Sequence, residues 1–186
     1  GGGHGLATAY YLAKEHGITN VAILEKGWIG GGNVGRNTTI LRSNYMFDSH
    51  SHFYEFGMKQ WGTLSQELNY NVMYSPRGII NLAHSDAQMN IYARRGNSMR
   101  LNGIDAVLLN REQVKEIIPM ADFSDNVRFP IFGGLMQPSA GTARHDAVAW
   151  GYARGADTMG VDIIQNCEVK GIKRNGDSIE GIETTK

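Results

Sequence analysis

The sequence has 186 residues, with 18 Lys and Arg against 18 Asp and Glu, so its formal net charge is zero. Such a balance argues against a nucleic-acid partner, which needs a basic excess on one face. The single cysteine excludes an internal disulfide and a thiolate metal cage, and no apolar run approaches the ~20 residues that span a bilayer, so we expect a soluble, cytoplasmic protein.

The first elements follow a strand–helix pattern around two groups of glycines. Good helix formers at 5–16 predict a helix, and Gly17 provides its stop. The short apolar run at 21–24 is typical of a parallel strand buried on both faces, and Glu25 ends it. A second glycine-rich segment then continues to about residue 35.

The middle of the chain predicts a mixed arrangement of helices and strands. A helix is expected at 49–68, with the aromatic residues Phe53, Phe56 and Trp61 in the core. Asn110 is expected to cap a short helix that ends before Pro119. The remaining expected elements are strands at 78–82 and 106–109, a helix at 87–101 and an irregular strand at 127–136.

The last part returns to the α/β pattern. A helix is expected at 146–159, then strands at 161–164, 168–173 and 179–183, with a hairpin turn at Asn175-Gly176. We therefore expect an α/β fold with an α+β insert. Residues 1–45 and 143–186 would form one lobe, and residues 46–142 would begin a second.

The first glycines predict a dinucleotide site. Gly2, Gly3 and Gly5 precede a helix whose N-terminus offers free N–H groups to a pyrophosphate, and Glu25 stands twenty positions after Gly5, where a ribose-binding acid is expected. A carboxylate there would repel a 2′-phosphate, which disfavours NADP. The alternative is an ordinary βα turn. The first glycine of the motif and the strand before it are not in the sequence, which suggests a fragment.

The second glycine group bears on which dinucleotide is bound. NAD domains usually continue with regular βα units after the acid, whereas here Gly30, Gly31, Gly32 and Gly35 follow. Such a segment could run along a longer cofactor, with Arg36 at a phosphate. A flexible surface loop is the alternative.

Four segments resemble a known family: 1–12 (GGGHGLATAYYL), 22–26 (AILEK), 35–45 (GRNTTILRSNY) and 143–151 (ARHDAVAWG). They resemble the beta subunits of heterotetrameric sarcosine oxidases, within the D-amino-acid-oxidase-like flavoproteins. The resemblance implies an FAD-binding Rossmann-like domain with part of a substrate, or catalytic, domain. It also implies that the C-terminal half, with most substrate contacts, is absent, so no catalytic residue is assigned.

The resemblance further implies an activity, cofactors and partners. The family demethylates sarcosine to glycine and forms hydrogen peroxide with formaldehyde or methylene-tetrahydrofolate. It uses non-covalent FAD and an FMN attached to a histidine that matches His145, whose imidazole is a competent nucleophile. The family's beta subunit assembles with alpha, gamma and delta subunits, and the alpha subunit carries NAD and tetrahydrofolate. Beside His145, Arg144 would supply positive charge near the flavin, and Asp146 would cap the following helix.

Carried over by position, the resemblance also implies a set of FAD contacts. At the pyrophosphate and adenosine ribose these are Gly2, Gly3, His4, Gly5, Glu25 and Lys26. Along the cofactor toward its flavin they are Asn33, Arg36, Thr39 and Ile40. Val169 is expected at the adenine edge.

Other interpretations stay open. One is a single-chain sarcosine or dimethylglycine dehydrogenase, or a glycine-oxidase-like amine oxidase. Another is a flavin-binding assembly module that is inactive in isolation, and we expect residues 1–186 alone to oxidise no sarcosine. His50 and His52, near Asp48, are read as a solvated helix start rather than a metal site.

Overall fold

The computed structural model describes residues 1–186 and divides into two compact units. The first comprises Gly1–Thr39, Leu64–Met73 and Ala143–Lys186, and the second Ile40–Thr63 and Tyr74–Thr142. Compared with the lobes expected from the sequence, residues 64–73 group with the first unit and residues 40–45 with the second. Helix α2 (Asp48–Glu67) therefore begins in the second unit and ends in the first.

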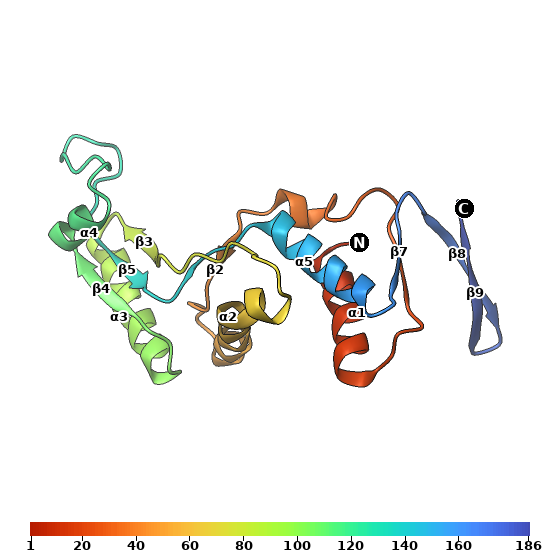
Figure 1. Cartoon of the computed structure of the whole chain (residues 1–186). Helices are drawn as coiled ribbons and strands as arrows, with labels where there is room; N and C mark the ends of the chain where they lie inside the picture. Colours follow the sequence, from red (N-terminus) through yellow and green to blue (C-terminus); the bar gives the residue numbers. More distant parts are fainter. The chain divides into compact units, whose positions relative to one another are not determined.

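The first unit is an α/β structure. Two of its strands pair in parallel, and two others form an antiparallel hairpin (Figure 1). Helix α1 ends at Gly17, which has the left-handed conformation (φ 64°) expected of a helix stop. The predicted helices, strands and hairpin turn are confirmed within a few residues. The elements are α1 (Gly3–His16), β1 (Ala22–Leu24), the 3₁₀ helix η1 (Asn33–Arg36), α5 (His145–Thr158), β7 (Asp162–Ile164), β8 (Val169–Asn175) and β9 (Ser178–Thr184).

Small residues bring α1 and α5 together. Ala9 and Ala13 on α1 are buried, as are Ala149 and Ala153 on α5, and the two helices lie side by side (Figure 1). A Cβ atom at Gly155 would lie 2.8 Å from the Tyr10 ring. The glycine therefore permits the close helix contact that positions both helix N-termini.

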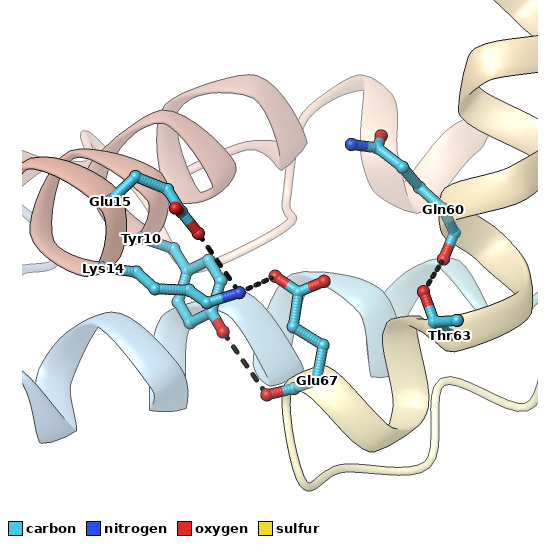
Figure 2. Close-up of polar contacts among 6 residues, drawn as sticks. All are labelled: Tyr10, Lys14, Glu15, Gln60, Thr63 and Glu67. Carbon is cyan, nitrogen blue, oxygen red and sulfur yellow. Dashed lines mark hydrogen bonds and ion pairs between the residues drawn. The ribbon is translucent and has the colours of Figure 1, made fainter.

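The end of α2 is fastened to α1 by side chains (Figure 2). Lys14 Nζ donates to Glu67 Oε1 at 2.8 Å, and the Tyr10 hydroxyl donates to the Glu67 carbonyl oxygen at 3.4 Å. Lys14 is partly exposed, so the ion pair itself is expected to contribute only about 0–1 kcal/mol. The buried apolar residues Leu64 and Leu68 beside it supply the larger part of this anchor.

The second unit is built on an antiparallel sheet in the order β3-β5-β4, against which α3 and α4 pack (Figure 1). Leu135, on the central strand, is fully buried with Met99 of α3, while Val114 of α4 packs with Leu109 of β4. The elements are β2 (Ile40–Leu41), β3 (Ile79–Ala83), α3 (Asp86–Leu101), β4 (Val107–Asn110), α4 (Arg111–Ile117), β5 (Gly133–Gln137) and β6 (Gly141–Thr142).

Local helix signals in this unit are confirmed. The Asn110 side chain accepts from the Gln113 N–H at 2.9 Å, and the Gln113 side chain accepts from the Asn110 N–H at 2.9 Å. This reciprocal capping box starts α4, as the predicted cap at Asn110 requires.

Two expectations are wrong. The strand expected at 127–136 begins only at Gly133, as β5. Pro130 cannot be part of it, because proline lacks the N–H that a residue of a central strand must donate. The aromatic residues Phe53 and Phe56 of α2 are not in the core; they are 72% and 63% exposed. The buried face of α2 instead carries Ser51, Met58 and Leu64, and Leu68, directly after the helix, is also buried.

None of the helices combines the length and the apolar character needed to cross a membrane.

Candidate functional site

The first unit contains a cleft of about 750 Å³ at the N-terminus of α1. Four segments meet there: the start of α1, the end of β1, the glycine-rich segment that follows it and the connection from β7 to β8, more than 100 residues later. Its lining residues are Gly2, Leu24, Glu25, Lys26, Gly27, Trp28, Gly31, Gly32, Arg36, Cys167, Glu168 and Val169.

The N-terminus of α1 enters this cleft without a protein cap. Gly2 is the N-cap residue, no side chain accepts a hydrogen bond from the helix end, and the first turn contains no acidic residue. The unpaired N–H groups and the positive end of the helix dipole therefore remain available to an anion.

Glu25 is held beside the start of α1 by backbone groups. The Gly27 N–H donates to Glu25 Oε1 at 2.8 Å, and the Gly1 nitrogen lies 3.0 Å from Glu25 Oε2. The Gly27 hydrogen bond holds the pKa of Glu25 below its usual range. Its main chain bridges β7 and the following loop, because the Glu25 N–H donates to Ile164 O and the Glu25 carbonyl accepts from the Cys167 N–H, both at 2.9 Å.

The glycine-rich segment is a hydrogen-bonded turn, which argues against the flexible surface loop. The Gly35 N–H donates to Gly30 O and the Gly30 N–H donates to Gly1 O, both at 2.9 Å. Gly30 has a positive φ of 73°, and a Cβ atom at Gly35 would lie 2.8 Å from Gly30 O. Glycine is required at both positions to hold this turn beside the start of α1.

The structure brings together part of the predicted set of FAD contacts. Gly2, Glu25, Lys26, Arg36 and Val169 all line the cleft, although they come from four segments. Lys26 and Arg36 add positive charge, and Val169, the first residue of β8, is 46% exposed.

Other predicted contacts lie outside the lining of this cleft. Gly3 and Gly5 belong to the first turn of α1, and His4 instead borders a separate hollow on the outer face of that helix. Asn33 begins η1 and is exposed. Thr39 has a positive φ of 61° and its carbonyl accepts from the Ala143 N–H, while Ile40 begins β2 in the second unit.

His145 is the first residue of α5, and its Nδ1 atom is buried without a hydrogen-bond partner. The neighbouring Arg144 is bound by Asp146, with Nε and Nη2 donating to the two carboxylate oxygens at 3.0 and 2.8 Å. The expectation that Asp146 caps the helix is wrong. Arg144 occupies the N-cap position, and Asp146 lies one residue inside the helix, where the arginine engages its carboxylate.

The cleft also includes residues that the sequence did not single out. Trp28 is 68% exposed, and a Cβ atom at Gly31 would lie 2.8 Å from its indole ring, so the glycine makes room for the tryptophan. The proximity of Gly31 to Trp28 in the sequence is a signal that could have found this pair. Glu168 has no such signal, because it reaches the cleft only through the pairing of β7 with β1.

The donor set fits a dinucleotide. The uncapped helix suits a pyrophosphate, the Glu25 carboxylate suits a pair of ribose hydroxyls, and the space beyond Gly32 is open, since a Cβ atom there would meet nothing within 4 Å. No group of three or more His, Cys, Asp or Glu side chains is arranged to hold a metal ion, and His50 and His52 are exposed on the first turns of α2.

Comparison with known proteins agrees with this geometry. The family model described as FAD dependent oxidoreductase matches residues 1–186. Sarcosine oxidase subunit beta of Rhizobium meliloti (strain 1021) is 64% identical over 186 residues, and that of Arthrobacter sp is 54% identical; each match covers all of this chain but only 44% and 46% of the relative. The chain thus spans about half the length of the curated relatives it matches.

Solved structures show the same fold. L-proline dehydrogenase from P. horikoshii superposes with a TM-score of 0.87 at 24% identity, over 100% of this chain and 47% of that one. Glycine oxidase from Bacillus cereus ATCC 14579 has a TM-score of 0.85 at 21% identity, over 99% and 49%. The α/β fold expected from the sequence is confirmed, as is the resemblance to sarcosine oxidase beta subunits, and the chain belongs to the family of FAD-dependent oxidoreductases.

Proposed function

We propose that this chain binds FAD as part of the beta subunit of a heterotetrameric sarcosine oxidase. The observation that carries the proposal is the cleft in which Gly2, Glu25, Arg36 and Val169 converge. The 64% identity with the Rhizobium meliloti beta subunit extends over the whole chain and supports the same assignment.

In this proposal each part of the cleft binds one part of FAD. The free N–H groups at Gly2, Gly3 and His4 bind the pyrophosphate, and Lys26 and Arg36 balance its charge. Glu25 accepts hydrogen bonds from the adenosine ribose. When bound, FAD supplies the two-electron oxidation of a carbon–nitrogen bond.

We propose further that His145 carries a covalently attached FMN. Its buried Nδ1 atom has no hydrogen-bond partner, which is the state of a nitrogen that is free to form a bond. Because Arg144 is already paired with Asp146, the charge next to the histidine is locally balanced rather than aimed at a phosphate.

The reaction in this proposal is the demethylation of sarcosine to glycine, with oxygen reduced to hydrogen peroxide. The methyl carbon leaves as formaldehyde or as methylene-tetrahydrofolate. The partners are alpha, gamma and delta subunits, with NAD and tetrahydrofolate on the alpha subunit. The relatives are themselves beta subunits, which supports the existence of partners.

A substrate of this kind carries a carboxylate, and Arg42 is our candidate to bind it. Arg42 lies in the second unit, directly after β2, and forms no salt bridge within the chain. An unpaired guanidinium is the usual protein group for two-point binding of a carboxylate.

Mass spectrometry of the holoenzyme tests the assignment. Trypsin cleaves after Arg144 and Arg154, so residues 145–154 form one peptide that contains His145. An FMN adduct on this peptide is expected. An FAD adduct would instead support a single-chain dehydrogenase, and an unmodified peptide would remove the covalent flavin.

A second test concerns activity. Residues 1–186 alone are expected to show no bleaching of bound flavin by sarcosine, whereas the holoenzyme is expected to bleach. Bleaching by the isolated chain would contradict this expectation.

A further inference from the structure

Beyond the flavin cleft, the second unit contains a buried polar cluster around the loop after β2. Asn44 is fully buried in this loop, and its side-chain Oδ1 accepts from Arg42 Nη1 at 3.1 Å. Arg95, on α3, donates through Nη2 to the Asn44 backbone carbonyl. One asparagine therefore links two arginines that are 53 positions apart in the sequence (95 − 42).

The loop that carries Asn44 is held rigidly from its other side. Ser43 is fully buried; its N–H donates to Gln137 Oε1 at 3.1 Å and its hydroxyl donates to Glu55 Oε2 at 2.7 Å. The Arg42 guanidinium lies 5.4 Å from the centre of the Tyr45 ring. These contacts leave the arginine few orientations.

The two arginines of this cluster have no anionic partner, since the nearby Glu55 carboxylate accepts from Ser43 instead. Asn44 Nδ2 and Arg95 Nε are both buried without a hydrogen-bond partner, and neither arginine forms a salt bridge. Burial, followed by the charge of Arg42, lowers the pKa of the Arg95 guanidinium from its usual range. Two neighbouring, partly buried cations and a buried amide donor without a partner are unfavourable unless a negatively charged group completes them.

We propose that Arg95 and Asn44 are positioning residues for carboxylate binding: Arg95 fixes the Asn44 backbone, and the Asn44 side chain fixes the Arg42 guanidinium that meets the carboxylate. This inference rests on the proposed function, which supplies the carboxylate on the amine substrate. In it, Arg95 acts through Asn44 and Arg42 and does not touch the substrate.

A double-mutant cycle in the holoenzyme tests this arrangement. Acetate serves as the probe, and its Kd is read from the change that it causes in the visible flavin spectrum. Arg42→Gln and Arg95→Gln are each expected to raise the acetate Kd and the sarcosine KM by about tenfold, the effect of losing one charge-assisted hydrogen bond, with a smaller change in kcat. The double variant is expected to match Arg42→Gln alone, because Arg95 has no effect once Arg42 is removed.

The matched control is Arg94→Gln, which removes the same charge from the adjacent, exposed position of α3. It is expected to leave the acetate Kd unchanged. An unchanged Kd in Arg95→Gln overturns the inference while Arg42 keeps its proposed role. Additive effects in the double variant overturn it as well, because Arg95 would then bind the carboxylate independently. A parent enzyme that neither binds acetate nor oxidises sarcosine overturns both the inference and the proposed substrate class.

Asn44→Asp provides a second variant if Arg95→Gln fails to fold. It places a carboxylate between the two arginines, so the thermal midpoint is expected to stay equal or rise while the acetate Kd increases at least tenfold. Flavin content reports on folding in each sample. An Asn44→Asp enzyme that binds acetate as tightly as the parent would show that Asn44 has only a structural role.

Discussion

The cleft of the first unit and the arginine cluster of the second use different chemical groups. The cleft is organised by main-chain groups: an uncapped helix N-terminus, a hydrogen-bonded glycine turn and a backbone N–H that fixes the Glu25 carboxylate. The cluster consists of side chains, Arg42, Asn44 and Arg95, and its unsatisfied atoms are an amide and a guanidinium nitrogen. A substitution cannot delete backbone groups, so a backbone site is disrupted by adding a side chain that fills it. A site of side chains is disrupted by replacing or shortening those side chains.

The largest expected effect comes from filling the backbone site with Gly2→Asp. Gly2 has φ −90° and ψ 176°, which any residue can adopt, and Asp is a better N-cap than Gly. The flavin-free protein is therefore expected to gain a few tenths of a kcal/mol of stability. FAD affinity is expected to fall by about 100-fold, because the new carboxylate occupies the place that we propose for the pyrophosphate.

Gly2→Asn is the control for this change, since it caps the helix equally without a charge. FAD titration and thermal unfolding without flavin measure both quantities. If Gly2→Asp binds FAD as tightly as the parent does, the helix N-terminus does not bind the pyrophosphate, and the difference between Gly2→Asp and Gly2→Asn reports the part of the loss that is due to charge.

The second-largest effect is expected in the loop that carries the arginine cluster. Gln137→Met keeps the size of a fully buried residue but leaves the Ser43 N–H without its acceptor. The free energy of unfolding is expected to fall by about 1–3 kcal/mol, the cost of one buried unsatisfied group. Urea unfolding measures it, with the exposed Gln66→Met as the control. An unchanged unfolding midpoint would show that Gln137 does not hold the loop.

This difference between backbone groups and side-chain groups also explains which features could be predicted from the sequence. The helix stop at Gly17, the cap at Asn110 and the Asn175-Gly176 turn are local signals, because each depends on the backbone conformation of a few neighbouring residues. Gly2 and Glu25 were predictable for the same reason: the spacing of a glycine turn and an acid is set by one βα unit.

The side-chain features had no comparable signal. Asn44 and Arg95 are joined by a contact across 51 positions, which no local pattern encodes. The aromatic stripe of α2 was misleading, because helical spacing predicts that residues share a face but not that the face is buried. Ser51, a polar residue, is buried there through a hydrogen bond from its hydroxyl to Tyr45 O at 3.0 Å.

The third prediction concerns Glu25, the side chain that backbone groups hold in the cleft. Glu25→Gln is expected to weaken FAD binding by about tenfold, because a neutral amide replaces a charged acceptor. The Gly27 N–H lowers the pKa of Glu25, so the carboxylate stays charged at neutral pH. In the parent, FAD affinity is expected to fall only as the pH drops through this lowered pKa, whereas the variant lacks that step.

The control for this prediction is Glu168→Gln, which removes the other carboxylate that lines the cleft. Glu168 is paired with Lys170, so its loss is expected to change FAD affinity less than the loss of Glu25. FAD titrations from pH 3 to pH 7 measure both variants. Equal losses in the two would mean that Glu25 contributes charge alone and no specific ribose contact.

The smallest effect is expected from the exposed Arg144–Asp146 pair, which lies on either side of His145 at the N-terminus of α5. The Arg144 hydrogen bonds lower the pKa of Asp146 to about 2. Because the folded pKa is depressed, the stabilisation is present above the ordinary Asp pKa of about 3.9 and is lost as the pH falls toward 2. Both side chains are more than half exposed, so solvent screening limits the cost of Asp146→Asn to at most about 1 kcal/mol at pH 7.

Urea unfolding at pH 7 and at pH 2.5 measures this cost and its disappearance. Asp157→Asn removes the same charge from the last turn of α5, where an anion faces the negative end of the helix dipole, and is expected not to destabilise. Equal unfolding midpoints for Asp146→Asn and the parent at pH 7 would show that the pair adds nothing to the stability of α5. The flavin attachment proposed at His145 would then depend on the buried Nδ1 atom and its surroundings alone.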